Sequence, residues 1–444
     1  MAGGVFKLSS PKVRPGVYVN VLNGRQPTAV DSKRGIAVIP LIGYDWGPRE
    51  EWIHLTAESP DAERVTLGRS VYDDNEQMML VRLLLMNATD VYLYIAGSGK
   101  KATGNITTGS GTAEVSAKYP GTLGNSIKIV SVANPISGFD VSVLINGEEV
   151  ELFEAITTVQ ELNSNYIEVT GDGDLTEFAS ATLSGGTDEQ GEVNASISKF
   201  LDMSEKVKFN CMAFPTKEEA LIKALITKIK YIRNAIGWKC HAVVANTAAD
   251  YEGIYNLTNG FEYEGKQLDA VKATAWLAGA VASADYLTSL TYTVVQGATK
   301  IVDEKTNEES VDAIKKGETF FSVDESGNVI LEYDVNSKVT FTETDPPDIR
   351  KGRSCRVYDS FANDLLTAFV PGRFNNDSDG WSVMESMGRA ILQAYEKDGA
   401  ITNVNLEEDF KVDTGTSSGE NVYIHVGIQA VNSAEKYYFT VVAR

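Results

Sequence analysis

The chain has 444 residues, of which 43% are hydrophobic and 23% charged, a composition typical of a folded globular protein. This length exceeds what one hydrophobic core usually serves, so two to four domains are expected. The formal net charge is −21, from 61 acidic and 40 basic residues. Such a surface repels phosphate backbones, which argues against direct nucleic-acid binding.

No apolar run approaches the roughly 20 residues that cross a bilayer, and the N-terminal MAGGVFKLSS lacks the regions of a signal peptide. We therefore expect no membrane insertion, and synthesis in the cytoplasm. The three cysteines, Cys211, Cys240 and Cys355, are widely spaced. Their spacing fits neither a zinc site nor a disulfide framework, so buried, reduced thiols are expected.

Both ends of the chain carry strand patterns with two apolar faces. These are RPGVYVN at residues 14–20 and KYYFTVVAR at residues 436–444. An apolar strand at a chain end needs a sheet to join, because an unpaired edge invites aggregation. The sequence thus raises the question of what the two ends pair with.

The first part of the chain alternates strands and a helix before its composition changes. GIAVIPLIG at 35–43 predicts a buried strand, residues 73–86 a helix, and DVYLYIA at 90–96 a second strand. From residue 97 to about 188 the chain is rich in Gly, Thr, Ser and Val, with short alternating segments such as NSIKIVSV. This change predicts an inserted all-β domain of the sandwich type.

The α/β pattern returns after residue 189. VKFNCMAFP predicts a strand, residues 216–237 an amphipathic helix with Thr216 as its N-cap, and KCHAVVAN the next strand. The expected buried stripe of the helix is Leu221, Leu225, Ile229, Ile232 and Ile236. A small-residue helix at 269–284 follows, and the alternation predicts right-handed crossovers in a mainly parallel sheet.

The last part of the chain predicts mixed elements. A hairpin is expected within residues 318–343, helices at 350–370 and 379–401, and a strand at 422–431 before the terminal strand. The segment PGRFNNDS joins the two helices.

The sequence offers no convincing catalytic constellation. Catalysis needs a nucleophile, a base and an orienting group within reach, and the chain has only three histidines. His54 lies in a surface-like segment, and His241 and His425 lie inside apolar strands. Packed or edge histidines are the simpler interpretation of all three, with a catalytic base as the alternative.

Three further motifs are also better explained as structure. GTSSG at 415–419 lacks the turn into a helix that positions a serine nucleophile, so a hairpin connection is expected. NNDSDG at 375–380 begins like a calcium loop, but the twelfth position holds Ser386 in place of glutamate. No GxxxxGK[ST] phosphate loop exists. We expect no cofactor, no metal and no enzymatic activity, which in a chain of this size indicates a structural or mechanical role.

Four segments, in chain order, resemble tail sheath proteins of contractile-tailed bacteriophages. KVRPGVYVN with GIAVIPLIGYDWGP is similar to the start of these proteins, and AKYPGTLGNSIKIVSV at 117–132 to the β-sandwich that many Gram-positive phage sheaths insert. Residues 205–246 resemble their central, subtilisin-like domain, and 355–401 the helical start of their C-terminal domain. The central segment lacks the Asp, His and Ser triad of subtilisins, so the resemblance implies that architecture without proteolysis.

The resemblance implies an α/β multidomain fold with a subtilisin-like central α/β domain, an inserted all-β sandwich, an α+β C-terminal domain and extended terminal arms. The expected domains are an N-terminal arm at 1–22, an N-terminal α/β domain at 23–98, the insert at 99–188, the subtilisin-like domain at 189–348 and the C-terminal domain at 349–444, whose residues 436–444 form an arm. Arms of such proteins leave their own subunit and join sheets of neighbouring copies, which would answer the question raised by the two ends.

The resemblance also implies a function. Copies of the chain would form stacked six-membered rings around a tail tube and contract to drive the tube through the host envelope, as part of a virion tail assembled in the bacterial cytoplasm. Expected partners are further copies of the chain, the tail tube protein, and the baseplate and tail terminator proteins. No nucleotide is needed, because the energy is stored in a metastable assembly.

Two sets of candidate residues follow from the resemblance. Inter-subunit strand exchange is assigned to Val17, Tyr18, Val19, Tyr437, Tyr438, Phe439, Val441 and Val442, and tube contact to Glu385, Arg389 and Lys397. A phage-tail-like bacteriocin or another contractile injection system would use the same protein and stays an alternative. A subtilisin-fold hydrolase is the alternative from another class, and a surface adhesin conflicts with the absence of a secretion signal.

Overall fold

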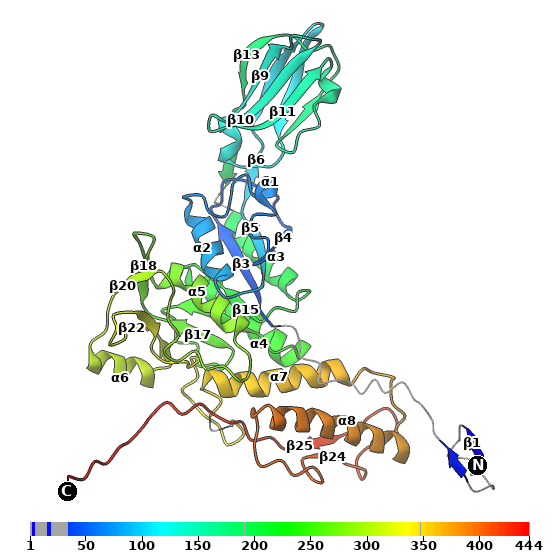
Figure 1. Ribbon diagram of the computed structural model, residues 1–444, viewed down its shortest axis with the longest axis vertical. Helices are drawn as coiled ribbons and strands as arrows, with labels where there is room; N and C mark the ends of the chain where they lie inside the picture. Colours follow the sequence, from blue (N-terminus) through cyan, green and yellow to red (C-terminus); the bar gives the residue numbers. More distant parts are fainter. Residues whose placement is uncertain (1, 5–15, 19–33, 190–191, 347, 444) are drawn as a thin grey trace. The chain divides into compact units, whose positions relative to one another are not determined.

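The computed structural model describes residues 2–4, 16–18, 34–189, 192–346 and 348–443 (Figure 1). These residues fall into two compact units. The larger unit comprises the described parts of Ser32–Asn363 and Ala430–Arg444, and the smaller unit those of Met1–Asp31 and Asp364–Gln429. None of the described helices has the length and apolar character needed to cross a membrane.

A seven-stranded sheet forms the centre of the larger unit. Its neighbouring strands are all parallel except for the antiparallel edge pair of β4 and β5. In order across the sheet the strands are β21 (Glu318–Thr319), β17 (Ile254–Leu257), β16 (His241–Ala245), β15 (Cys211–Ala213), β3 (Ile36–Ile42), β5 (Asp90–Ala96) and β4 (Trp52–Thr56). The mainly parallel sheet predicted from the alternating pattern is confirmed.

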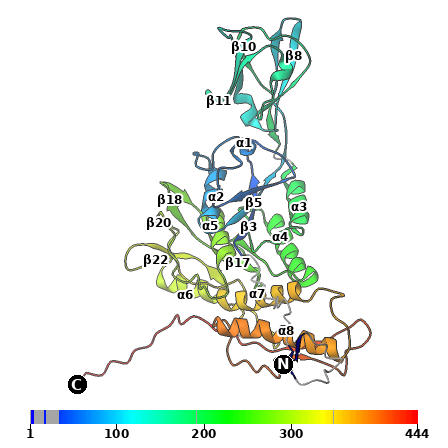
Figure 2. The ribbon, with the colours of Figure 1, turned by 45° about the vertical axis from the view of Figure 1, so that its right-hand side comes forward.

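Helices cover both faces of this sheet (Figure 2). They are α2 (Glu76–Leu85) and α5 (Ala270–Ser283) on one face, and α3 (Val193–Ser204) and α4 (Glu219–Tyr231) on the other. Side chains alternate along β3, so Ala37 and Ile39 join the core beneath α2 and α5, whereas Val38 joins the core beneath α3 and α4. A strand buried on both faces needs apolar residues at every position, which explains the uninterrupted GIAVIPLIG.

Smaller elements complete the larger unit outside the insert. They are α1 (Arg64–Leu67), the antiparallel strands β18 (Gly260–Tyr263), β19 (Lys266–Leu268) and β20 (Ala298–Val302), helix α6 (Asn307–Lys315), and the hairpin of β22 (Phe321–Val323) and β23 (Val329–Leu331). Thr306 and Glu309 form a reciprocal capping box at the start of α6. The hairpin lies within the predicted range 318–343.

The insert is a β-sandwich of two antiparallel sheets. One sheet contains β11 (Glu148–Ile156), β10 (Phe139–Ile145), β9 (Ile127–Ala133) and β13 (Phe178–Thr182), and the other β12 (Ile167–Thr170), β8 (Gly111–Ala117) and β7 (Thr103–Thr108). Ile106, Val115 and Val141 are fully buried between them. The entry strand β6 (Ser98–Lys100) pairs antiparallel with the exit strand β14 (Thr187–Glu189), so both ends of the insert meet. The predicted β-sandwich is confirmed.

The smaller unit is built around α8 (Ser378–Lys397), the last residues of α7 (Gly352–Ala368) and the antiparallel pair β24 (Phe410–Val412) and β25 (Ile424–Val426). The ring of Phe410 stacks on Phe369 and lies so close to α8 that a Cβ at Gly388 would approach it to 2.2 Å. The NNDSDG motif supplies the cap of α8, because the Asp377 side chain accepts from the backbone N of Gly380 at 2.8 Å. The unit also contains the short parallel pair β1 (Ala2–Gly4) and β2 (Gly16–Tyr18).

Three local predictions are wrong. Helix α2 begins at Glu76, because Asn75 accepts from the amides of the first turn. Thr216 does not cap α4; its hydroxyl accepts from the N of Glu218 in the preceding turn, and the helix begins at Glu219. The strand predicted at 422–431 is limited to Ile424–Val426 within the described chain, since only these residues find a partner in β24.

The paired ends of the insert generate a prediction. Replacing residues 101–186 by a short Gly/Ser linker should leave the seven-stranded sheet folded, because β6 and β14 already bring the junctions together. Trp46 is buried against Tyr119 of the insert and becomes exposed in that variant. The free energy of unfolding of the variant should therefore fall by about 1.5–3 kcal/mol. Circular dichroism and chemical denaturation measure both effects; loss of the helical signal would contradict the prediction.

Candidate functional site

Helix α7 is buried along most of its course through the larger unit, although it is rich in polar residues. The buried polar side chains there are Ser354, Arg356, Asp359, Ser360 and Asn363. A buried charge without a partner is strongly destabilising, so the partners of Arg356 and Asp359 identify what holds the helix in place.

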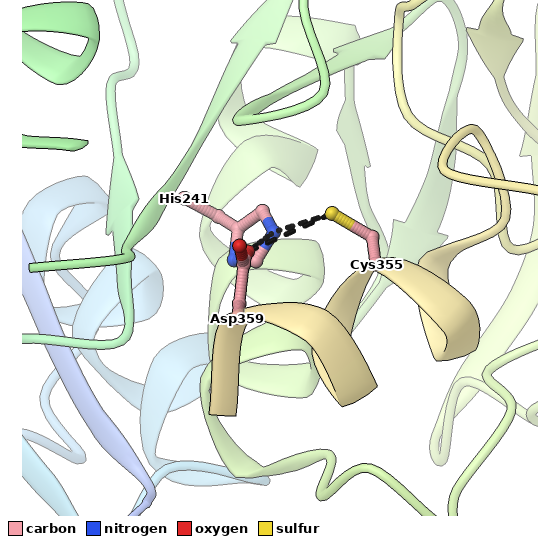
Figure 3. Close-up of side chains that lie close together, drawn as sticks. All are labelled: His241, Cys355 and Asp359. Carbon is pink, nitrogen blue, oxygen red and sulfur yellow. Dashed lines mark hydrogen bonds and ion pairs between the residues drawn. The ribbon is translucent and has the colours of Figure 1, made fainter. Parts of the chain in front are cut away.

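Asp359 is the centre of a closed polar cluster. Arg233 binds both carboxylate oxygens, with Nη1 donating to Oδ2 at 2.7 Å and Nη2 to Oδ1 at 2.9 Å. The His241 Nε2 lies 3.2 Å from Oδ2. The Sγ of Cys355 lies 3.6 Å from that oxygen and 3.7 Å from Nε2 (Figure 3).

Arg233 reaches Asp359 because the end of α4 changes its winding. Ile232–Ile236 forms a π-helical turn that closes at Gly237, which has a φ of 94°. The wider turn buries Arg233 and leaves Ile236 exposed, so the prediction that Ile236 belongs to the buried stripe is wrong. Asn363 reinforces this junction through two hydrogen bonds to the backbone of Lys239, which follows the turn.

The charges of this cluster are fixed by burial and by the ion pair. Burial opposes ionisation of Asp359, but the charge of Arg233 outweighs it and holds the pKa of the carboxyl below its ordinary value. Burial lowers the pKa of His241 to about 3 and raises that of the Cys355 thiol well above its ordinary value. At neutral pH the cluster therefore contains an ionised pair, a neutral imidazole and a neutral thiol.

This arrangement suits neither catalysis nor metal binding. His241, Cys355 and Asp359 are close enough to share a cation. However, Arg233 already occupies both oxygens of Asp359, and its charge would repel a cation. The Cys355 thiol is fully buried and its raised pKa keeps it protonated, so it is not activated as a nucleophile. We interpret the cluster as the structural joint between α7 and the sheet.

A second buried ion pair joins α7 to Asp334, which follows β23, and its arginine also binds the segment after α5. Arg356 Nη2 lies 2.7 Å from Asp334 Oδ2, and the same guanidinium donates to the carbonyls of Asp285 and Thr288. Asp334 also accepts from the N of Leu290 at 3.0 Å. Gly352 is required beside this pair, since a Cβ there would lie 1.9 Å from Asp334 Oδ1.

Arg34 and Gly35, the first described residues after the N-terminal segment, are attached at the end of α5. The N of Gly35 donates to the carbonyl of Ala282 at 2.9 Å, and Arg34 Nη2 donates to that of Val281 at 3.2 Å. Burial and the nearby charge of Arg356 lower the pKa of Arg34 to about 10. Arg34 and Gly35 are thus bonded to the end of α5 within the larger unit.

The C-terminal segment exposes an apolar strand pattern. Tyr437, Tyr438, Phe439, Val441 and Val442 are between 69% and 91% exposed. The rings of Tyr437 and Phe439 stack with centroids 6.5 Å apart, as alternate residues do on one face of an extended chain. No helix or strand is assigned among residues 432–443. Exposed runs of large apolar side chains are typical of segments that bind other proteins.

The other candidate residues lie in the smaller unit or outside the described residues. On α8, Arg389 pairs with Glu385 at 3.1 Å, and Glu385 also accepts from the N of Val412 in β24, whereas Lys397 is exposed. Val17 and Tyr18 lie in β2, but their side chains, like the whole of Val19, lie outside the described residues.

The remaining motifs have structural positions. His54, at the sheet edge, contacts Asp90 at 3.0 Å and stacks on Tyr92. His425 is exposed on β25. GTSSG lies between β24 and β25, as the predicted hairpin connection requires, and Ser417 accepts from the N of Tyr423. The three cysteines are buried and free, as predicted.

Comparisons with known proteins identify the family. Models of the phage tail sheath protein β-sandwich domain, central domain and C-terminal domain match residues 97–188, 190–337 and 344–444. The XkdK protein of the phage-like element PBSX from Bacillus subtilis is 31% identical, over 99% of both chains. The chain belongs to the phage tail sheath protein family. Family members are structural proteins, so this sheath protein is not an enzyme.

Solved structures agree with this assignment. The sheath tail protein DSY3957 from Desulfitobacterium hafniense is 30% identical, with a TM-score of 0.83 over 95% of this chain and 98% of that chain. The helical sheath of the anti-feeding prophage in its contracted state is 12% identical, with a TM-score of 0.59 over 98% of this sheath chain and 99% of that chain. The second likeness concerns the fold alone.

Sequence reasoning missed the polar residues that organise α7. Arg233 interrupts an apolar helix stripe, and Cys355, Asp359 and Asn363 recur at four-residue spacing, which places them on one helix face. A polar face on a helix that also carries apolar residues was the available signal. It could not reveal which partners the face would meet.

The neutral imidazole of His241 predicts a pH dependence of stability. In the unfolded chain the pKa of His241 returns to about 6.5. As pH falls from about 6.5 towards 3, the unfolded chain therefore binds a proton at His241 that the folded protein does not bind, and the folded state loses stability. This site alone should lower the free energy of unfolding by about 1.4 kcal/mol between pH 7.5 and 5.5.

Chemical denaturation of His241→Gln and of the exposed control His425→Gln tests this assignment. The His241→Gln variant should lack the decrease of about 1.4 kcal/mol between pH 7.5 and 5.5, whatever its absolute stability, and the His425→Gln control should retain it. An unchanged slope in His241→Gln would refute the buried neutral state.

Proposed function

We propose that this sheath protein polymerises as a helical stack of six-membered rings around a tail tube and contracts to drive that tube through the host envelope. The observation that carries the proposal is the exposed apolar segment at 437–442, which has the sequence pattern of a strand, in a chain of this family. A subunit that functions as a monomer would cover such a segment. Hollow cylinders of purified protein under negative-stain electron microscopy are the expected result, and persistent monomers at high concentration would contradict it.

The strand is proposed to add to a sheet in a neighbouring copy. The pair β24 and β25 has two strands only among the described residues, so it offers edges to an incoming strand. Val17, Tyr18 and Val19 of the N-terminal arm are proposed to take part in the same exchange. A contact that joins different surfaces of successive copies is heterologous, and its repetition builds an open helix.

Contraction is proposed to proceed by near-rigid movement of the subunits while the exchanged arms keep the lattice connected. The closed ion pairs of α7 support rigid movement, because opening them would expose unpaired charges. The insert is proposed to lie on the outer surface of the cylinder; its two ends meet in one strand pair, which supports its being a separate domain outside the central sheet.

Further parts of the proposal rest on the family resemblance. The central sheet is proposed to have a subtilisin-like arrangement without proteolytic activity, and the domains to divide as 1–22, 23–98, 99–188, 189–348 and 349–444. Tube, baseplate and terminator proteins are the proposed partners, with assembly in the cytoplasm of the host. The name of the PBSX relative, a phage-like element, supports a related contractile device as an alternative setting.

The arm predicts the effect of Phe439→Asp. This change places a charge on a side chain that is 86% exposed in the subunit, so the folded monomer should be unaffected. In a neighbour's sheet the same side chain would be buried, contributing on the order of 1.5–3 kcal/mol per link. Sedimentation should show loss of polymers while circular dichroism stays unchanged. Should the monomer unfold instead, the strand belongs to its own subunit's core.

The proposed tube-facing side predicts an effect of charge reversal on α8. Lys397→Glu, at an exposed position, and Arg389→Glu should each weaken co-assembly with the tube at low salt, where surface charges act most strongly. Arg389→Glu also loses its pair with Glu385, so Arg389→Gln serves as the control for that loss. Tube binding equal to wild type in both reversal variants would remove α8 from the tube interface.

A further inference from the structure

At the base of the C-terminal arm, alternate side chains are half-buried against the larger unit, as in an extended chain. Ser433 and Glu435 are half-buried, whereas Ala434 and Lys436 are exposed. Arg353 Nη1 donates to Ser433 Oγ at 2.9 Å. Alternate side chains thus attach the chain up to Glu435, and the exposed apolar residues begin directly beyond it.

Glu435 makes the most extensive of these contacts. Its Oε1 accepts from Ser289 Oγ at 3.0 Å and from Thr291 Oγ1 at 2.9 Å, and its Oε2 pairs with the ammonium of Lys351. The side chains of Glu435 and Lys351 are only 12% and 16% exposed. Both carboxylate oxygens are therefore satisfied in a partly desolvated position, unlike those of an ordinary surface ion pair.

The groups that hold Glu435 are themselves fixed. Lys351 Nζ lies 3.6 Å from the ring centroid of Tyr333. Thr291 Oγ1 also accepts from the backbone N of Asp334. The side-chain carboxylate of Asp334 pairs with Arg356 inside the larger unit. The attachment of Glu435 is thus continuous with the buried ion pair of α7.

The surroundings of this attachment are unusual for a passive surface. A cavity of about 480 Å³ lies beside it, lined among others by Tyr292, Tyr333, Glu435 and Tyr437. Tyr292 is 61% exposed and has a left-handed φ of 61°, a conformation that is uncommon for a bulky side chain. Strained backbone next to an interaction segment points to a functional location.

We propose that Glu435 is the positioning residue of the exchanged arm, fixing the point where the chain leaves the subunit. The proposal rests on the proposed strand exchange. With Glu435 held, the eight described residues beyond it, 436–443, span about 26 Å when extended. If Glu435 and then Ser433 detach, the free segment gains about 3 Å for each added residue. The attachment therefore sets the tether length between neighbouring copies, and with it the spacing that the lattice can adopt.

A charge-swap series tests the attachment in the dilute, unassembled subunit. Glu435→Lys and Lys351→Glu each bring like charges together, and the double variant restores an ion pair of opposite polarity. Hydroxyl groups both donate and accept, so Ser289 and Thr291 can serve either polarity. Chymotrypsin cleavage after Tyr437 requires the residues before it to enter the protease, so it should be at least tenfold faster in each single variant and return towards wild type in the double variant. Glu420→Lys, at an exposed position, is the matched control and should change nothing.

Electron microscopy of assembled cylinders tests the positioning role. Each single variant should broaden the distribution of axial spacing, and the double variant should narrow it again. Unchanged cleavage in the single variants would overturn the attachment, and faster cleavage with wild-type spacing would overturn its positioning role. Deletion of residues 436–444 tests strand exchange separately: polymers formed without the arm would overturn the proposed strand exchange, whatever the cleavage data show.

Discussion

The ion pair between Arg233 and Asp359 imposes the constraint on which the larger unit depends. A carboxylate this deeply buried is tolerated only with both oxygens bound, so α7 can pack against the sheet in a single register. The π-helical end of α4, which carries Arg233, and the side-chain amide of Asn363, which binds Lys239, both stabilise α7 in this register. Once α7 is set, Arg356 orders the segment after α5 through Asp334 and two carbonyls. Specificity of packing, more than net stability, is what such pairs supply.

The sheath protein thus combines a closed interior with an exposed C-terminal segment. Inside the larger unit, charged groups of α7 have their partners and the central sheet is covered on both faces. At the C-terminus the opposite holds, because large apolar side chains stand exposed on an extended backbone. A subunit that must change neighbours without unfolding needs this division, since its own contacts have to outlast those between copies.

Much of the fold could be predicted from the sequence, because its strongest signals are local. The apolar run GIAVIPLIG, the alternating strands of the insert and the capped helices each report on one element. Arg233 and Asp359 show the limit, since they are 126 residues apart and nothing local marks them as partners. Glu435 was hidden for the same reason: its three partners come from two other segments, and a lone glutamate before an aromatic strand looks like a solubilising charge.

The attachments of the two chain ends have a mechanical consequence. Arg34 and Gly35 are bonded to Val281 and Ala282, Glu435 to Ser289 and Thr291, and Arg356 bridges the stretch between them. Under the proposed strand exchange, tension that enters through one arm would leave through the other along this short stretch of backbone. The central sheet and the β-sandwich lie outside this stretch. Contraction would therefore load the backbone between the two attachments and leave the hydrophobic cores of the sheet and the β-sandwich unstrained.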